Sequence, residues 1–542
     1  MTDPTIADHA IEAMRLAGVD TLFCLPGVQN DDFFDTLHDA GDITPIVTRH
    51  EQGAAYMAMG AAQATGRTAA CSVVPGPGML NASAALSSAY WGNARVLALV
   101  GEIPTFAQGR AFGVLHELPD QQAILEQLTK HAALLDDAGT AVAGLQAALD
   151  AVVSGRPRPV SVEVPVNRWR STAAGALVAP EPEVPTIDQN ALDRAVDVIR
   201  SAERPLIVVG GGAQDAGAEV GALAELLQAP VTTRRMGHGV IPTAHPLFAH
   251  LPMGHRLWSH ADVVIGIGTR MEWPLLHWGI DDGMTIVKID IDPDELDRHD
   301  VGTVGVAGDA AAVCRALVDE LAPDGRRADR SDEVAALRHQ YAADLAWLQP
   351  QLAHLAAIRD VLPDDGVFVE DVTQIGFAAH LAFDFRRPRT LLSSGPAGTL
   401  GAGYAQALGA QYALQREGRR AVAVCGDGGF LFTGNELATA VQHDIHLVAI
   451  VYNDGAYGNV KRMQQQKFGE DRTIASTLQN PDFVAYARSF GAVGMHAANP
   501  DEVRIRLDEA FSIDAPVIIE AAAAPMPDPW PLFLRGPARG TR

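Results

Sequence analysis

Cysteine is scarce in this chain, which has four in 542 residues: Cys24, Cys71, Cys314 and Cys425. They are scattered, with no Cys-x-x-Cys pair and no spacing typical of metal ligands. This distribution excludes a disulfide framework. It indicates small buried residues in a reducing compartment.

Long apolar runs are also lacking, since no stretch approaches the roughly 18 residues that a membrane-spanning helix needs. Residues 1–14 are acidic and contain no basic segment followed by an apolar one, so no export signal is visible. We therefore expect a cytoplasmic protein.

Basic residues are few relative to acidic ones: 41 Lys and Arg against 66 Asp and Glu, for a formal net charge of −25. This balance excludes nucleic acid and anionic membranes as partners, because both are themselves negatively charged. An anionic cofactor is still possible, since local N–H groups and a metal ion decide its binding rather than the global charge.

The chain is long enough for about three to four domains. Strand and helix patterns alternate along it, which predicts an α/β fold of doubly wound parallel sheets. The breaks are PEPEVP at 180–185 and the charged DGRRADRSD at 324–332. We expect three domains, at 1–172, 186–328 and 340–530. The tail at 531–542 is expected to be either disordered or a lid.

Two apolar strands end at acidic residues in the last third of the chain. The strand 421–424 leads to Asp427 between glycines, and the strand 447–452 leads to Asn453-Asp454-Gly455. In an open α/β sheet such ends meet at one crevice, where oxygen ligands and close-approaching N–H groups suit a metal and a phosphate. A tight turn is the alternative interpretation. Residues 433–436, Thr-Gly-Asn-Glu, predict a capping box at the start of the next helix.

Glu51 opens a helix rich in Ala, Met and Gly. Small residues predict close packing, in which a carboxylate needs a partner or takes up a proton. Two interpretations of Glu51 are open: a functional acid, or a first-turn residue that complements the helix dipole.

These residues carry a resemblance to a known family. Residues 49–55, RHEQGAA, and the GDG at 426–428 followed by Asn453 resemble the signatures of the thiamine diphosphate enzymes. The chain looks most like their acetolactate synthase branch, over essentially its whole length. The resemblance implies a pyrimidine-binding first domain, a central domain and a diphosphate-binding third domain.

By this resemblance the cofactors are thiamine diphosphate and Mg²⁺. Glu51 would hydrogen-bond N1′ of the aminopyrimidine, which lets N4′ remove the thiazolium C2 proton to give the ylid. Asp427, Asp454 and the main-chain carbonyl of Ala456 would hold Mg²⁺. The family usually has Asn-Asn where this chain has Asn453-Asp454, and a carboxylate there still suits a hard cation.

The glycine-rich stretch 393–403 is similar to the family loop that shapes the cofactor. The Gly398 carbonyl would accept from N4′, and Leu400 would wedge between the two rings to bring N4′ close to C2. A plain glycine-rich turn into a helix is compatible with the same role. Further cofactor contacts are expected at Pro26, Gly78, Gln374, Thr399, Gly426, Gly428, Gly429, Tyr457 and Gly458.

The expected substrate pocket departs from that of true acetolactate synthases. Where they have Pro-Gly-Gly, residues 26–30 read Pro-Gly-Val-Gln-Asn, so a side chain intrudes over the thiazolium. His116 is a candidate acid–base group, and a surface-loop histidine is the alternative. The expected pocket residues are Val28, Gln29, His116, Met463 and Gln464.

We therefore expect a thiamine-diphosphate-dependent decarboxylase or carboligase acting on a small 2-oxo acid. Alternatives within the family are a non-ligating decarboxylase and a lyase acting on a 2-hydroxyacyl or acyl-CoA substrate. Outside the family, a nucleotide-binding protein could use Gly210–Gly212 and Asp427 as phosphate sites, and a catalytically silent scaffold is a further alternative.

Two expectations about assembly and further cofactors follow from the resemblance. Relatives place the cofactor between the first domain of one subunit and the third domain of another, so we expect a homodimer or homotetramer with active sites at the interface. Some relatives bind FAD or a nucleotide in the central domain. FAD is possible here but not favoured, because the usual flavin-contacting phrase is not recognisable after Gly268.

Overall fold

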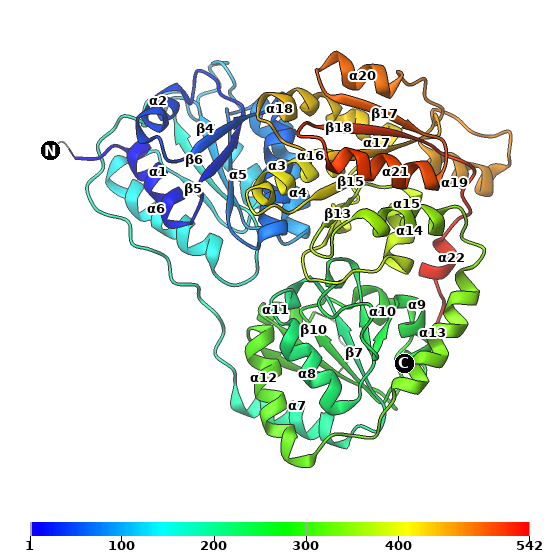
Figure 1. Ribbon diagram of the computed structural model, residues 1–542. Coiled ribbons are helices and arrows are strands. Elements are labelled where there is room, and N and C mark those ends of the chain that lie inside the picture. Colours follow the sequence, from blue (N-terminus) through cyan, green and yellow to red (C-terminus); the bar gives the residue numbers. More distant parts are fainter. Residues whose placement is uncertain (1–2, 299–301, 541–542) are drawn as a thin grey trace.

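The computed structural model describes residues 3–298 and 302–540. It contains three six-stranded sheets in succession along the chain, each parallel throughout and flanked by helices (Figure 1). The predicted α/β class is thus confirmed. The predicted domain boundaries stay predictions.

The first sheet has the order β2-β1-β3-β4-β6-β5. Its central strands are buried along their whole length, as expected for a parallel sheet covered on both faces. The strands are β1 (Thr21–Cys24), β2 (Thr44–Val47), β3 (Ala69–Val73), β4 (Val96–Glu102), β5 (Ala132–Leu134) and β6 (Val160–Pro165). The helices are α1 (Ile6–Leu16), α2 (Asp31–Ala40), α3 (Glu51–Thr65), α4 (Pro77–Trp91), α5 (Gln121–Leu128) and α6 (Ala138–Val153).

The central sheet has the order β12-β11-β10-β7-β8-β9. Its strands are β7 (Pro205–Val209), β8 (Val231–Thr233), β9 (Phe248–Ala249), β10 (Val263–Ile267), β11 (Thr285–Asp290) and β12 (Thr303–Ala307). The helices are α7 (Gln189–Ser201), α8 (Gly217–Leu227), α9 (Leu251–Trp258), α10 (Glu272–His277), α11 (Pro293–Leu296), α12 (Ala310–Leu321) and α13 (Ser331–Leu345).

The third sheet has the order β14-β13-β15-β16-β18-β17, the same pattern as the first. Its strands are β13 (Val367–Glu370), β14 (Leu391–Leu392), β15 (Ala421–Gly426), β16 (Val448–Asn453), β17 (Val493–Ala497) and β18 (Val517–Ala522). The helices are α14 (Gln351–Val361), α15 (Gln374–Ala382), α16 (Ala402–Gln415), α17 (Asp427–Thr433), α18 (Leu437–Gln442), α19 (Gly458–Phe468), α20 (Phe483–Ser489), α21 (Pro500–Phe511) and α22 (Trp530–Phe533).

Helices α3 and α16 join the first and third domains in the upper part of Figure 1. Their contact is reciprocal: a Cβ on Gly60 would collide with the main-chain oxygen of Gln406, and one on Gly409 would collide with that of Met57. Both helices are buried nearly all round. The small residues of α3 therefore allow two helix backbones to touch.

The predicted capping box at residues 433–436 is wrong. Thr433 Oγ1 donates to the Gly401 carbonyl, and α18 begins after Glu436 without a side-chain cap. The Glu436 carboxylate instead accepts the N–H of Arg49, at 3.0 and 3.1 Å, from the start of α3. Glu436 thus pairs with a residue of another domain instead of forming the predicted local cap.

The tail is not disordered up to residue 540. Trp530 packs on Phe377 and donates from Nε1 to Asn459 Oδ1 at 3.2 Å. Further along, the N–H of Ala538 bonds the Trp278 carbonyl, and Arg539 pairs with Asp281. The tail thus ties α19 to the central domain, and residues 541 and 542 lie outside the described part.

Within the described residues, no helix combines the length and the apolar character needed to cross a membrane.

Candidate active site

The strand orders mark where ligands bind in each sheet. In the first and third sheets the order reverses between β1 and β3 and between β13 and β15. Such switch points open a crevice at the carboxyl ends of the strands. The candidate residues are distributed over these two crevices.

In the third domain, Asp427 stands at the end of β15 as the first residue of α17. Its buried carboxylate accepts the N–H of Gly455 at 2.9 Å and the side-chain amide of Asn480. Asp454, at the end of the neighbouring β16, accepts the N–H of Ala456 at 3.1 Å. The structure therefore brings the three predicted metal ligands together in one pair of loops.

The electrostatics of this loop pair fit a cation. Desolvation, and then the charge of Asp427, raise the pKa of Asp454 to about 6. A divalent ion would stabilise two carboxylates held together in this way. It would take further oxygen ligands from the Ala456 carbonyl and from water. These donors are carboxylate and carbonyl oxygens, which suit a hard cation such as Mg²⁺.

Glycines shape the surface beside the carboxylates. A Cβ on Gly428 would lie 2.7 Å from the Tyr457 ring, and one on Gly429 would lie 2.5 Å from Asp371. A Cβ on Gly458 would collide with Asp454. By contrast, Gly426 has room for a side chain. The three glycines thus let the loops pack closely on Tyr457, Asp371 and Asp454.

Asp371, at the end of β13, anchors the loop that contains Gly398, Thr399 and Leu400. It is buried and accepts the N–H of Gly401 at 3.2 and 3.3 Å; burial raises its pKa to about 6. Gly398 has a φ of +58°, and its carbonyl lies in an exposed turn, while Leu400 is half-buried.

Gln374 is the clearest sign of a missing partner. Its Nε2 and Oε1 are both buried, and neither has a hydrogen-bond partner among the described residues. Buried amides are normally satisfied, so this one fits a polar ligand such as a diphosphate oxygen. The donor set, the glycine surface and this amide together fit a metal-bound diphosphate.

In the first domain, Glu51 lies at the start of α3, 8% exposed. Asn81 of α4 donates to its Oε2 at 3.0 Å, and Gly78 lies beside its Oε1. Gly27, directly after Pro26, and Gly78 both pack on Val74, which closes the ends of β1 and β3 around Glu51.

The predicted pocket residues are placed unevenly. Val28 is 62% exposed, whereas Gln29 is buried, so Val28 rather than Gln29 faces outward. The His116 backbone, with φ +68°, packs against Gly76, and its Nδ1 is buried without a partner in the described part. Met463 of α19 is exposed, and Gln464 of the same helix exchanges hydrogen bonds with the backbone of Ile474, in the loop that follows.

Glu51 and Asp427 belong to different crevices of the chain. Over residues 3–298 and 302–540, the side-chain hydrogen bonds of Glu51 stay in the first domain, and those of Asp427 stay in the third. We name the crevice of Glu51 and the crevice of Asp427 the two half-sites.

Sequence reasoning missed three residues of these half-sites. Asn480 comes from a loop far along the chain and carries no local signal. Asn81 stands three residues after the PGPG turn, where that turn could have drawn attention to it. Asp371 opens the loop that leads to Gln374, but nothing in the sequence indicates that it would anchor residues 398–401.

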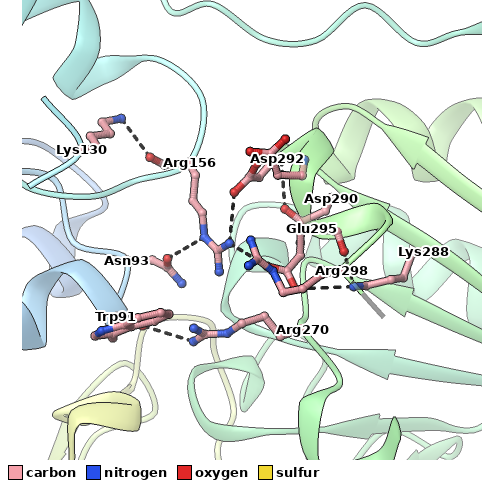
Figure 2. A network of polar contacts seen from close by, with 11 residues as sticks. Trp91, Asn93, Lys130, Arg156, Arg270, Lys288, Asp290, Asp292, Glu295 and Arg298 are labelled. Atoms are coloured by element: carbon pink, nitrogen blue, oxygen red, sulfur yellow. Dashed lines mark hydrogen bonds and ion pairs between the residues drawn. The ribbon is translucent and has the colours of Figure 1, made fainter. Parts of the chain in front are cut away.

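The switch point of the central sheet lies between β7 and β10, where two glycine turns meet. A Cβ on Gly212 would lie 2.8 Å from Cα of Gly268, so the Gly210–Gly212 loop packs against its neighbour. At the end of β11, Arg156 of the first domain pairs with Asp292 at 3.2 Å and Glu295 at 3.0 Å (Figure 2).

Models of three domains of one family match successive parts of the chain. The N-terminal TPP binding domain of thiamine pyrophosphate enzymes matches residues 4–124, their central domain matches 192–317, and their C-terminal TPP binding domain matches 371–521. The chain belongs to the thiamine pyrophosphate enzyme family. As such it is an enzyme that uses thiamine diphosphate, which overturns the alternatives of a nucleotide-binding protein and of a silent scaffold.

Relatives of this thiamine pyrophosphate enzyme match it along nearly the whole chain. A probable 2-ketoarginine decarboxylase of Pseudomonas aeruginosa is 33% identical, covering 95% of this chain and 93% of its own. The large subunit of acetolactate synthase isozyme 2 of Escherichia coli is 30% identical, over 98% and 97%. A probable acetolactate synthase large subunit of Methanocaldococcus jannaschii is 29% identical, over 96% and 93%.

Proposed function

We propose that this thiamine pyrophosphate enzyme decarboxylates a small 2-oxo acid and, in the presence of a carbonyl acceptor, forms a carbon–carbon bond. The observation that carries the proposal is the pairing of a buried acid at one switch point with a cation site at the other. The relatives act in the same reaction class, by their names.

The proposed roles follow from the contacts described above. Asp427, Asp454 and the Ala456 carbonyl hold Mg²⁺; Gln374 and the N–H groups beside Gly428, Gly429 and Gly458 bind the diphosphate. Glu51 holds a proton for the pyrimidine. When bound, thiamine diphosphate supplies a carbon nucleophile that adds to the substrate carbonyl and accepts the charge left by CO₂.

The Gly398–Leu400 turn shapes the cofactor in this proposal, and Pro26, Thr399, Gly426 and Tyr457 complete the contacts. Val28, His116 and Met463 face the substrate, and His116 is the group that can deliver a proton. Gln29 and Gln464 support the pocket from behind.

Thermal unfolding with added ligands tests the proposal. Thiamine diphosphate with Mg²⁺ should raise the unfolding temperature, because a ligand that binds only the folded state stabilises it. NAD and FAD serve as controls. An unchanged unfolding temperature with the thiamine pair would contradict the proposed site.

Product analysis separates ligation from simple decarboxylation. Pyruvate is supplied alone and with an aldehyde, and a panel of 2-oxo acids should include one with a guanidinium side chain, the class named for the Pseudomonas relative. An acyloin or acetohydroxy acid indicates a carboligase. An aldehyde as the sole product indicates the non-ligating alternative, and cleavage of a 2-hydroxyacyl-CoA indicates a lyase.

A homodimer or homotetramer is part of the proposal, in which the two half-sites meet across a subunit interface. Exposed apolar side chains support it: α19 has no buried residue in the single chain, Met463 is 57% exposed, and Ile474 beside it is 78% exposed. On the first domain, Phe106, Phe112 and Leu115 are likewise exposed. An active monomer in sedimentation velocity would contradict the assembly.

We further infer that the central domain holds no flavin, since the usual flavin-contacting phrase is not recognisable after Gly268 and the Gly210–Gly212 turn packs closely on that residue. A flavin absorbance in the purified enzyme would contradict this inference. The four cysteines are all buried and free, which supports a cytoplasmic location.

A further inference from the structure

Glu51 presents two carboxylate oxygens with different surroundings. Oε2 accepts a hydrogen bond from Asn81 Nδ2 at 3.0 Å. Oε1 has no hydrogen-bond partner in the described part of the chain and lies beside Gly78, where a Cβ would stand 3.4 Å away. One oxygen is therefore held, and the other is left open.

The neighbouring histidine does not compete for Oε2. His50 Nδ1 lies 4.0 Å from Oε2, but it caps α3 by accepting the N–H of Gln52 at 3.1 Å. A neutral imidazole that accepts at Nδ1 carries its proton on the other nitrogen. The side-chain donor on Oε2 is thus the Asn81 amide.

The backbone before Asn81 directs this residue toward Glu51. Gly76 has a φ of +60°, its N–H donates to Gln121 Oε1 at 2.8 Å, and Pro77 starts α4. This turn points the first part of α4 at the start of α3. Asn81 itself is exposed in the single chain, so its amide needs no partner for its own burial.

We propose that Asn81 is a positioning residue for the acid. Its amide holds Oε2 of Glu51, so that Oε1 carries the proton exchanged with the pyrimidine ring of the cofactor. The inference rests on the role proposed for Glu51. It adds the identity of the reacting oxygen and of the group that selects it. Gly78 keeps the approach to Oε1 open.

The test uses the full-length enzyme with Mg²⁺ and thiamine diphosphate. Asn81→Ala should slow hydrogen–deuterium exchange at C2 of the bound cofactor about tenfold, because a hydrogen bond to a carboxylate is lost. Asn81→Asp is isosteric and places a second negative charge beside Oε2. It should slow the exchange further, and more at pH 8 than at pH 6, where a proton relieves the repulsion. Ser83→Ala, on the same helix and away from Glu51, is the matched control.

Equilibrium binding gives a readout that does not depend on turnover. Asn81→Ala should weaken binding of thiamine diphosphate several-fold. It should leave unchanged the binding of a pyridine analogue that has carbon in place of N1′. Equal weakening for both ligands would assign Asn81 a general structural role and overturn the inference, as would exchange rates within twofold of wild type in both Asn81 variants.

Glu51→Gln separates this inference from the proposed function. If Glu51→Gln exchanges C2–H at the wild-type rate, the role of Glu51 itself is lost. If Glu51→Gln is slow while both Asn81 variants exchange normally, the function stands and the Asn81 inference is wrong.

Discussion

At the scale of single residues, Glu51 combines two requirements in one side chain. It must sit on a helix that packs closely on another domain, and it must still reach a ligand. Glu51→Gln keeps the shape and removes the acid, so the fold and cofactor affinity should be nearly unchanged. We expect C2–H exchange to fall by about 100-fold or more, the range of a positioned acid or base. Nuclear magnetic resonance of the bound cofactor measures this rate, and circular dichroism checks the fold.

Glu163 of β6 is a buried acid that the reaction does not use. Both carboxylate oxygens lack hydrogen-bond partners in the described part, and the side chain is fully buried. Burial, and then Glu102, Asp120 and Glu126 nearby, raise its pKa from 4.5 to about 8. The folded chain therefore binds a proton here that the unfolded chain has lost.

This raised pKa predicts a pH dependence of stability. Between pH 4.5 and about 8 the folded state binds the extra proton, so the contribution of Glu163 to stability falls as pH rises. The slope is about 1.4 kcal/mol per pH unit at most. Glu163→Gln should remove this slope. The free energy of unfolding of the variant, measured in urea, should therefore rise relative to that of wild type between pH 6 and pH 8. The same pH dependence of the free energy of unfolding in both proteins would contradict the prediction.

At the scale of elements, the contact between α3 and α16 depends on glycine. Gly60→Ala would push its methyl group into the backbone of Gln406. We expect a loss of about 1–3 kcal/mol, the usual cost of overpacking, together with weaker cofactor activation because Glu51 begins the same helix. Gly221→Ala in α8, where a Cβ meets nothing within 4 Å, is the control and should be neutral or stabilising. Chemical denaturation of both variants measures the difference.

The elements show how far sequence reasoning extends. Glycine-bounded strands such as β15 were predictable because a parallel strand reads as an apolar run and its end as a turn. The start of α18 was not, because Glu436 satisfies the N–H of Arg49 in another domain instead of capping its own helix. The tail was not predictable either, since the partner of Trp530 is a helix far away in sequence.

The candidate site divides in the same way. Motifs at 49–55 and 426–428 pointed to Glu51 and Asp427 because their local sequence is distinctive. The residues that hold these two side chains, Asn81 and Asn480, come from other segments. Only the fold brings them near Glu51 and Asp427, and the one local signal is the Pro-Gly-Pro-Gly turn before Asn81.

At the scale of the whole molecule, the first and central domains are joined by the charged network of Figure 2. Arg156 is mostly buried; it bridges Asn93 of its own domain to Asp292 and Glu295 of the other. Glu295 is also paired with Lys288 and Arg298. At this edge of the central sheet, charged side chains form the contact between the two domains.

Arg156→Met should therefore loosen the central domain. Removing one partner of a buried pair costs about 3 kcal/mol, because the remaining carboxylates stay buried. Arg298→Met is the matched control: its side chain is 51% exposed, and its loss should cost under about 1 kcal/mol. Thermal unfolding compares the two variants, and equal losses would show that Arg156 makes no special contribution.

Two half-sites in one chain also predict complementation between subunits. Glu51→Gln and Asp427→Asn should each inactivate the enzyme. Co-expressed, they form mixed dimers in which one of the two sites receives both intact residues. Each mixed dimer should recover about half of wild-type activity, and a random mixture, of which about half is mixed dimers, about a quarter. If each site were built within one subunit, the mixture would stay inactive.

The shared strand order of the first and third sheets has an evolutionary consequence. Helices α3 and α16 each follow the second strand of their domain in chain order. A glycine of each helix packs on the backbone of the other: Gly60 on Gln406, and Gly409 on Met57. That relation is expected of an ancestral gene duplication, in which one module met its own copy face to face. In the proposed function, one of these two modules supplies the proton and the other binds the phosphate.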